Sequence, residues 1–104
     1  MELNEIKQYL RIDGDEDNEL LSSLYLATKS YIENATGITE DMAQENGKLK
    51  ELYNLTNKIL LAHWYENRVP QMTGSNFHKL DFSLESLFLQ LEAEYLKMKR
   101  VDEA

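Results

Sequence analysis

The sequence predicts an all-α fold, a compact bundle of about four helices, of which one is short and three are long. In four separate segments of the 104-residue chain, apolar residues recur at the spacing of one helical face. The chain has only four glycines and one proline, which favours long regular elements over tight turns. We expect residues 1–104 to form one domain with a flexible end at about 101–104, because two separate cores would each bury too little apolar surface.

The first two helices are predicted on either side of an acidic turn. The first covers about residues 4–11 and leads into the polar turn "RIDGDEDN", where Gly14 permits unusual backbone dihedrals. The second covers about residues 16–36, and Gly37 follows at the position where a left-handed residue commonly ends a helix. Residues 38–47 are a polar connection with room for one loose helical turn. The apolar stripe predicted for the second helix is Leu20, Leu24, Ala27, Tyr31 and Ala35, with Leu21, Thr28 and Ile32 beside it.

The third and fourth helices are predicted on either side of a longer loop. The third covers about residues 48–68 and is apolar nearly all round, which indicates burial by several neighbours or by another subunit. Pro70 favours an end of the third helix two residues earlier, at about residue 68. Residues 70–82 are then predicted to form the loop between the third and fourth helices. The fourth helix runs from Ser83 as N-cap to about Arg100. Its apolar stripe is Leu84, Leu87, Phe88, Leu91, Tyr95 and Met98.

The net charge of −8 lies entirely in the first half of the chain. Residues 1–47 contain eleven acids and three bases, whereas residues 48–104 contain eight of each. Nucleic-acid binding depends on basic surfaces that displace counterions, so an acidic chain is more suited to a basic protein partner. The beginning, "MELNEIKQYL", lacks the features of a signal peptide, and no apolar run is long enough to span a membrane. We therefore expect a soluble protein made in the cytoplasm, without membrane contact.

The acidic turn resembles the start of a calcium-binding loop. Asp13, Asp15 and Asp17 alternate like the first ligands of an EF-hand. However, the sixth position holds Asn18 in place of glycine, and the twelfth holds Leu24 in place of a bidentate glutamate. The chain also has no cysteine, which excludes thiolate metal sites. The sequence therefore predicts no metal site and no cofactor.

The stretch "LAHWYENRVP", residues 61–70, gathers polar tips at the end of the third helix. His63 has no second histidine four residues away, so the zinc-protease pattern is absent, and no nucleophile signature surrounds it. We predict no catalytic residue, although a hydrolase that uses His63 and Glu66 is a remaining alternative. The stretch is interpreted as a structural anchor or a subunit interface, made of His63, Trp64, Tyr65, Glu66 and Arg68. Whether Trp64 faces its own core or the next subunit is left open.

Three stretches, in this order, resemble one known family. They are "IKQYLRIDGDEDNELLSSLYLATKSYIENATG" (6–37), "KILLAHWYENR" (58–68) and "LDFSLESLFLQL" (80–91). The family is the head–tail connector, or head-completion adaptor, of tailed bacteriophages and prophages, also described as a DNA-packaging protein. Asp81 stands where the family pattern favours proline, and residues 38–47 have no clear counterpart.

The resemblance implies a non-enzymatic subunit of a ring, typically twelvefold in the virion, beneath the portal. Such a ring extends the DNA channel without binding DNA specifically, and it docks the next tail-side completion protein. It implies a place in the virion neck, and in the host bacterial cytoplasm during assembly. Lys97, Lys99 and Arg100 are the candidate contact with the portal. The alternative function is an acidic helical module or regulator that binds a basic partner.

Overall fold

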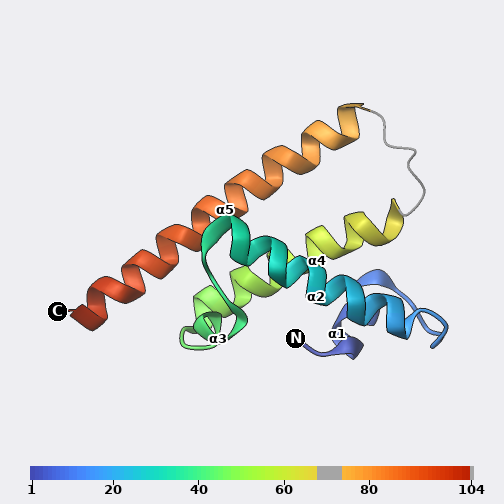
Figure 1. Ribbon diagram of the computed structural model, residues 1–104, viewed down its shortest axis with the longest axis horizontal. Coiled ribbons are helices and arrows are strands. Elements are labelled where there is room, and N and C mark those ends of the chain that lie inside the picture. The colour runs from blue at the N-terminus through green and yellow to red at the C-terminus, as the bar shows by residue number, and fades with distance from the viewer. Residues whose placement is uncertain (68–73, 104) are drawn as a thin grey trace.

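Five α-helices make up the described part of the chain, which comprises residues 1–67 and 74–103, with side chains described for 1–67 and 84–99. In this computed structural model they are α1 (Leu3–Leu10), α2 (Asn18–Thr36), the single-turn α3 (Glu40–Ala43), α4 (Gly47–Glu66) and α5 (Gly74–Glu103) (Figure 1). No strand occurs in these ranges. The predicted all-α class is confirmed, and so is the single helical turn expected between residues 38 and 47.

The core consists of two apolar clusters arranged along α4. The N-terminal cluster joins α1, α2 and the end of α4, and is made of Ile6, Leu21, Tyr25 and Leu61. The C-terminal cluster joins the end of α2, α3, the start of α4 and α5, and is made of Ile32, Ile38, Ala43, Leu49, Tyr53 and Leu91. Between the two, the Thr28 hydroxyl of α2 donates a 2.8 Å hydrogen bond to Oδ1 of Asn57 on α4, and both residues are buried. A polar bridge therefore fixes how α2 lies on α4.

The turn after α1 differs from its predicted form. The residue with the left-handed backbone is Arg11, at φ 59°, and not Gly14. The Arg11 N–H donates to the Gln8 carbonyl, and the Ile12 N–H donates to the Lys7 carbonyl at 2.9 Å. This is the Schellman arrangement, in which an apolar residue after the left-handed position packs back onto the helix. Ile12 does pack against the N-terminal cluster, and that contact explains why the chain reverses at Arg11.

The buried stripe of α2 lies one residue away from the predicted one. Its buried members are Leu21, Tyr25, Thr28 and Ile32. Ala27 and Ala35, which the sequence placed in the core, are exposed, and Tyr31 is 46% exposed. Two neighbouring stripes of α2 have the same helical spacing and comparable hydrophobicity. The choice between them is made by α1 and α4, which lie against the Leu21 side.

The fourth predicted helix begins nine residues earlier than expected. α5 starts at Gly74, so the loop predicted over 70–82 is wrong from residue 74 onward, and Ser83 lies within the helix. After Gly74 no glycine or proline interrupts the chain, and Phe77 and Leu80 extend the helical spacing of the later stripe backwards. The predicted stripe itself is confirmed, with Leu84 and Leu91 buried and its other members half-buried.

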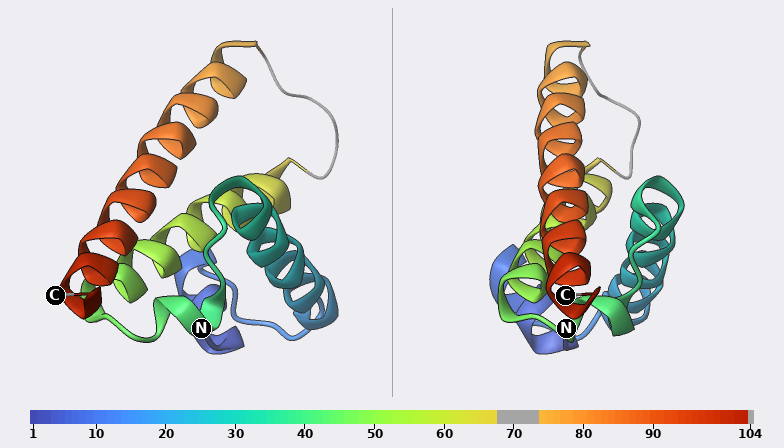
Figure 2. Two further views of the ribbon diagram at one scale, coloured as in Figure 1. Left: turned by 60° about the vertical axis from the view of Figure 1, so that its left-hand side comes forward. Right: turned by 90° about the vertical axis from the view of Figure 1, so that its left-hand side faces the viewer.

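The long helix α5 packs against α4 in the opposite direction. The two helices lie side by side where α4 begins and α5 ends, and they diverge toward the other end (Figures 1 and 2). Lys48 and Glu94 form a 3.1 Å ion pair across the close end. The C-terminal cluster lies beneath this pair, so the basic end of α5 emerges beside the start of α4.

Gly37 ends α2 with a left-handed backbone at φ 79°, as predicted. We expect Gly37→Ala to lower the free energy of unfolding by about 1 kcal/mol, because a Cβ disfavours this backbone conformation. No atom lies within 4 Å of the added Cβ, so a clash makes no contribution. Gly47→Ala is the control, since Gly47 is the first residue of α4 and has equally open surroundings. It should be neutral or stabilising in urea unfolding followed by circular dichroism, and equal losses in both variants would contradict the prediction.

Candidate functional site

Tyr65, in the last turn of α4, connects that helix to the start of α2. Its hydroxyl donates a hydrogen bond to the carboxylate of Asp17, the residue before α2. Its ring packs against the N-terminal cluster. Tyr65 is half-buried, with an apolar ring against the core and a hydroxyl that has a partner. It therefore joins the end of α4 to the residue before α2.

Trp64 belongs to a row of aromatic rings shared by three helices. Its ring meets Tyr31 of α2 edge-on, with centroids 5.7 Å apart and planes at 89°. Tyr31 in turn lies 6.1 Å from the ring of Phe88 on α5. This aromatic row, Tyr31, Trp64 and Phe88, joins α2, α4 and α5 at the edge of the core. Trp64 is half-buried, so it packs against its own chain and keeps part of its surface accessible.

His63 and Glu66 do not form a pair. Nδ1 of His63 lies 3.3 Å from Nδ2 of Asn67, and the same amide donates to the His63 carbonyl at 2.9 Å. Glu66 is exposed, and no ion pair joins it to His63 in the described ranges. The described residues therefore show His63 in contact with Asn67, and no contact with Glu66 of the kind that the hydrolase alternative would use. Arg68 lies outside the described residues.

The basic end of α5 presents exposed cations. Lys97 and Lys99 are both exposed, and the Arg100 side chain lies outside the described ones. The Lys48 ammonium holds the pKa of Glu94 below its ordinary value, and Lys97 lies 3.5 Å from the same carboxylate. Glu94 is therefore shared, with Lys48 as its closer partner. Nζ of Lys99 lies 5.8 Å from the ring centroid of Tyr95.

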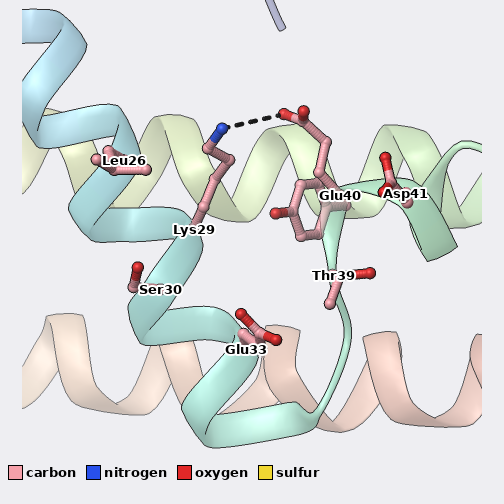
Figure 3. Close-up of a pocket in the computed structure, with 8 residues that line it drawn as sticks. Leu26, Lys29, Ser30, Glu33, Thr39, Glu40 and Asp41 are labelled. Carbon is pink, nitrogen blue, oxygen red and sulfur yellow. Dashed lines mark ion pairs between the residues drawn. The ribbon is translucent and has the colours of Figure 1, made fainter.

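A groove between α2 and the α3 segment was not predicted from the sequence. It has a volume of about 270 Å³, and Figure 3 shows residues from both of its walls. We call it the α2–α3 groove; it is lined by Leu26, Lys29, Ser30 and Glu33 of α2, by Thr39, Glu40 and Asp41, and by Tyr53 of α4. These residues come from three separate segments, so no local motif marks them. The excess of acids before residue 47 was the sole signal available in the sequence.

Three acids line the groove, and one of them is compensated. The Tyr25 hydroxyl donates a hydrogen bond to Glu40, and Lys29 lies 3.7 Å from the same carboxylate (Figure 3). Mainly because of the Tyr25 hydrogen bond, the pKa of Glu40 is below its ordinary value. Glu33 and Asp41 are exposed and form no ion pair with any residue in the described ranges. The groove therefore carries two uncompensated negative charges.

Tyr53 also lines the groove and carries an unsatisfied hydroxyl. The residue is fully buried, and its hydroxyl oxygen has no hydrogen-bond partner among the described residues. Burial raises the pKa of Tyr53 to about 12, so the phenol stays neutral at physiological pH. Buried polar groups usually have a partner. Because this oxygen is closed to solvent, a molecule in the groove cannot reach it without movement of the surrounding side chains.

A family model described as Phage gp6-like head-tail connector protein matches residues 1–93. The chain belongs to this family. The resemblance seen in the sequence is thereby confirmed, and connectors of this family are structural proteins of the phage neck. No curated protein and no solved structure matches the chain. The match ends within α5, before Lys97, Lys99 and Arg100, so the basic end of this connector lies beyond the matched region.

Two features are absent from the part of the connector that the structure describes. There, no three His, Cys, Asp or Glu side chains are grouped so that they could hold a metal ion. None of the described helices combines the length and the hydrophobicity needed to cross a membrane.

The lowered pKa of Glu40 predicts how the stability of the connector depends on pH. A carboxyl whose folded pKa lies below its unfolded value of 4.5 stabilises the fold above pH 4.5, and that contribution disappears as the pH falls through the folded pKa. Glu40→Gln should therefore be less stable than the unmodified protein at pH 7, and the difference should shrink below about pH 4.5. Urea unfolding of both proteins at pH 7, 5 and 3.5 measures it. A difference independent of pH would contradict the assignment.

Proposed function

We propose that this connector subunit is a non-enzymatic structural adaptor that forms a ring beneath the portal of a tailed phage or prophage. The ring, twelvefold in the virion, joins head to tail and extends the DNA channel. The family match over residues 1–93 is the observation that carries the proposal. The partners are other copies of the chain, the portal protein and the next tail-side completion protein.

The charge of the chain is consistent with a channel through which DNA moves. A protein that grips DNA neutralises phosphates with basic side chains. This chain has a net charge of −8, and its first half supplies all of the excess. An acidic ring lumen would repel the DNA backbone and let it slide. DNA is therefore a passing partner in this proposal, not a specifically bound one.

The site residues divide between anchoring and contact in this proposal. Tyr65 and Trp64 hold the end of α4 against α2, through Asp17 and the aromatic row. His63 and Glu66 are the candidate contacts with a neighbouring subunit, and the proposal gives the same role to Arg68 from the sequence alone. The basic end of α5 is a protein-contact surface, for which the portal and a neighbouring copy of the chain are the two candidate partners.

Deletion of the gene in the phage or prophage that encodes it tests the proposal. We expect lysates that accumulate separate heads and tails, because the adaptor between them is missing. A plasmid copy of the gene should restore joined particles, and electron microscopy distinguishes the two results. Normal tailed particles from the deletion strain would overturn the proposal and would favour the alternative of a regulator with a basic partner.

A further inference from the structure

Two surfaces of opposite charge lie at different places on this chain. The α2–α3 groove carries the uncompensated carboxylates of Glu33 and Asp41. The end of α5 carries Lys97 and Lys99, both exposed, followed by Arg100, and these three bases outnumber the two acids of the last turn, Asp102 and Glu103. Each surface also has a large exposed apolar side chain: Leu26, 63% exposed, lines the groove, and Leu96, 54% exposed, lies next to Lys97. The two surfaces are therefore complementary in charge, and both offer apolar area.

The groove has the character of a site for a single side chain. Its volume of about 270 Å³ lies near the lower end of the roughly 300–1,000 Å³ of small-molecule pockets. The exposed carboxylates of Glu33 and Asp41 are the acceptors that the groove offers to an incoming ammonium or guanidinium group. Ser30 of α2 adds a hydroxyl to the wall, whereas the Thr39 hydroxyl caps α3 by accepting a hydrogen bond from the Met42 N–H. A lysine or arginine side chain between the carboxylates of Glu33 and Asp41 matches this set of groups.

We propose that the α2–α3 groove receives the basic end of α5 from a second copy of this chain. The inference rests on the proposed ring, since a closed ring joins two different surfaces of each subunit. Both required surfaces are present on one chain, and they differ in position and in sign of charge. Exposed charge pairs mainly set orientation and association rate, while Leu26 and Leu96 supply the apolar contact. Association between copies should therefore weaken as salt is raised.

Disulfide trapping tests this contact directly, because the chain has no cysteine of its own. Asp41→Cys and Lys97→Cys are prepared as separate proteins, mixed, and oxidised gently. The expected product is the heterodimer, in excess of random pairing, identified by intact mass. Because each protein carries a single cysteine, no disulfide can form within one chain. Glu19→Cys, on the exposed side of α2 and outside the groove, is the matched partner for a control mixture with Lys97→Cys. Equal yields of the two heterodimers would overturn the proposal.

Charge exchange separates this inference from the proposed function. Glu33→Lys with Asp41→Lys should weaken self-association in mass photometry by tenfold or more, and adding Lys97→Glu with Lys99→Glu to the same chain should restore it. Circular dichroism checks that each variant is folded. Self-association unaffected by Glu33→Lys with Asp41→Lys would overturn the inference. Loss of portal binding with intact self-association would also overturn it, by assigning the groove to the portal, and would leave the adaptor function standing. An unmodified protein that binds neither itself nor the portal would overturn both.

Discussion

Leu21→Ala is expected to lower the free energy of unfolding by about 2–5 kcal/mol. Leu21 is 0% exposed and lies in the N-terminal cluster with Ile6, Tyr25 and Leu61. Truncation removes buried methyl groups and leaves a cavity between α1, α2 and α4. The surrounding helices can close this cavity only in part, because each also packs against other residues.

Alanine substitutions at two further leucines of α2 serve as controls for Leu21→Ala. Leu26→Ala removes the same atoms from a side chain that is 63% exposed, so its effect should stay within about 0.5 kcal/mol. Leu20 is half-buried, and Leu20→Ala should fall between the other two. Urea unfolding measures the three free energies of unfolding, and they are compared by using one common value for their dependence on urea concentration. A larger loss for Leu20→Ala than for Leu21→Ala would instead support the stripe predicted from the sequence.

The helices themselves were predictable because their signals are local. Apolar spacing marked each of the long helices, and Gly37 marked the end of α2. The orientation of α2 was not predictable in the same way. Its residues at 20, 24 and 27 and those at 21, 25 and 28 are both compatible with a buried face, so periodicity cannot choose between them. The choice depends on the helices that pack against α2, and those contacts are long-range.

The start of α5 shows a similar limit. Ser83 is a good N-cap by residue type, but a serine within a helix costs little. Nothing after Gly74 forces the chain out of a helical conformation, so α5 continues through Ser83. The preference of serine for the N-cap position was therefore outweighed by the uninterrupted helical pattern that follows Gly74.

The candidate site was predictable only where its residues are neighbours in sequence. His63 to Glu66 form one stretch, and the structure keeps them together at the end of α4. The α2–α3 groove combines Lys29 and Glu33 with Asp41 and with Tyr53, which are brought together by the reversal of the chain after Gly37. The charge imbalance indicated an acidic surface, but it could not place that surface in a groove between α2 and the α3 segment.

Thr28→Val is expected to lower the free energy of unfolding by about 1–3 kcal/mol, although it changes little volume. The Thr28 hydroxyl has one proton and lies 2.9 Å from the Tyr25 carbonyl and 2.8 Å from Oδ1 of Asn57. Both side chains are fully buried, so water cannot replace the lost donor. The penalty comes from Oδ1 of Asn57, which the substitution leaves without its hydrogen bond.

A second substitution should recover part of that loss. Asn57→Leu in the Thr28→Val background removes the orphaned amide and places an apolar side chain between the two clusters. The double variant should therefore be more stable than the sum of the single losses implies, with a coupling of about 1 kcal/mol. Urea unfolding of the four proteins measures this coupling, and strictly additive losses would contradict it. Lys29 follows Thr28, and Tyr53 lies one turn before Asn57, so this buried pair also aligns the two helices that line the α2–α3 groove.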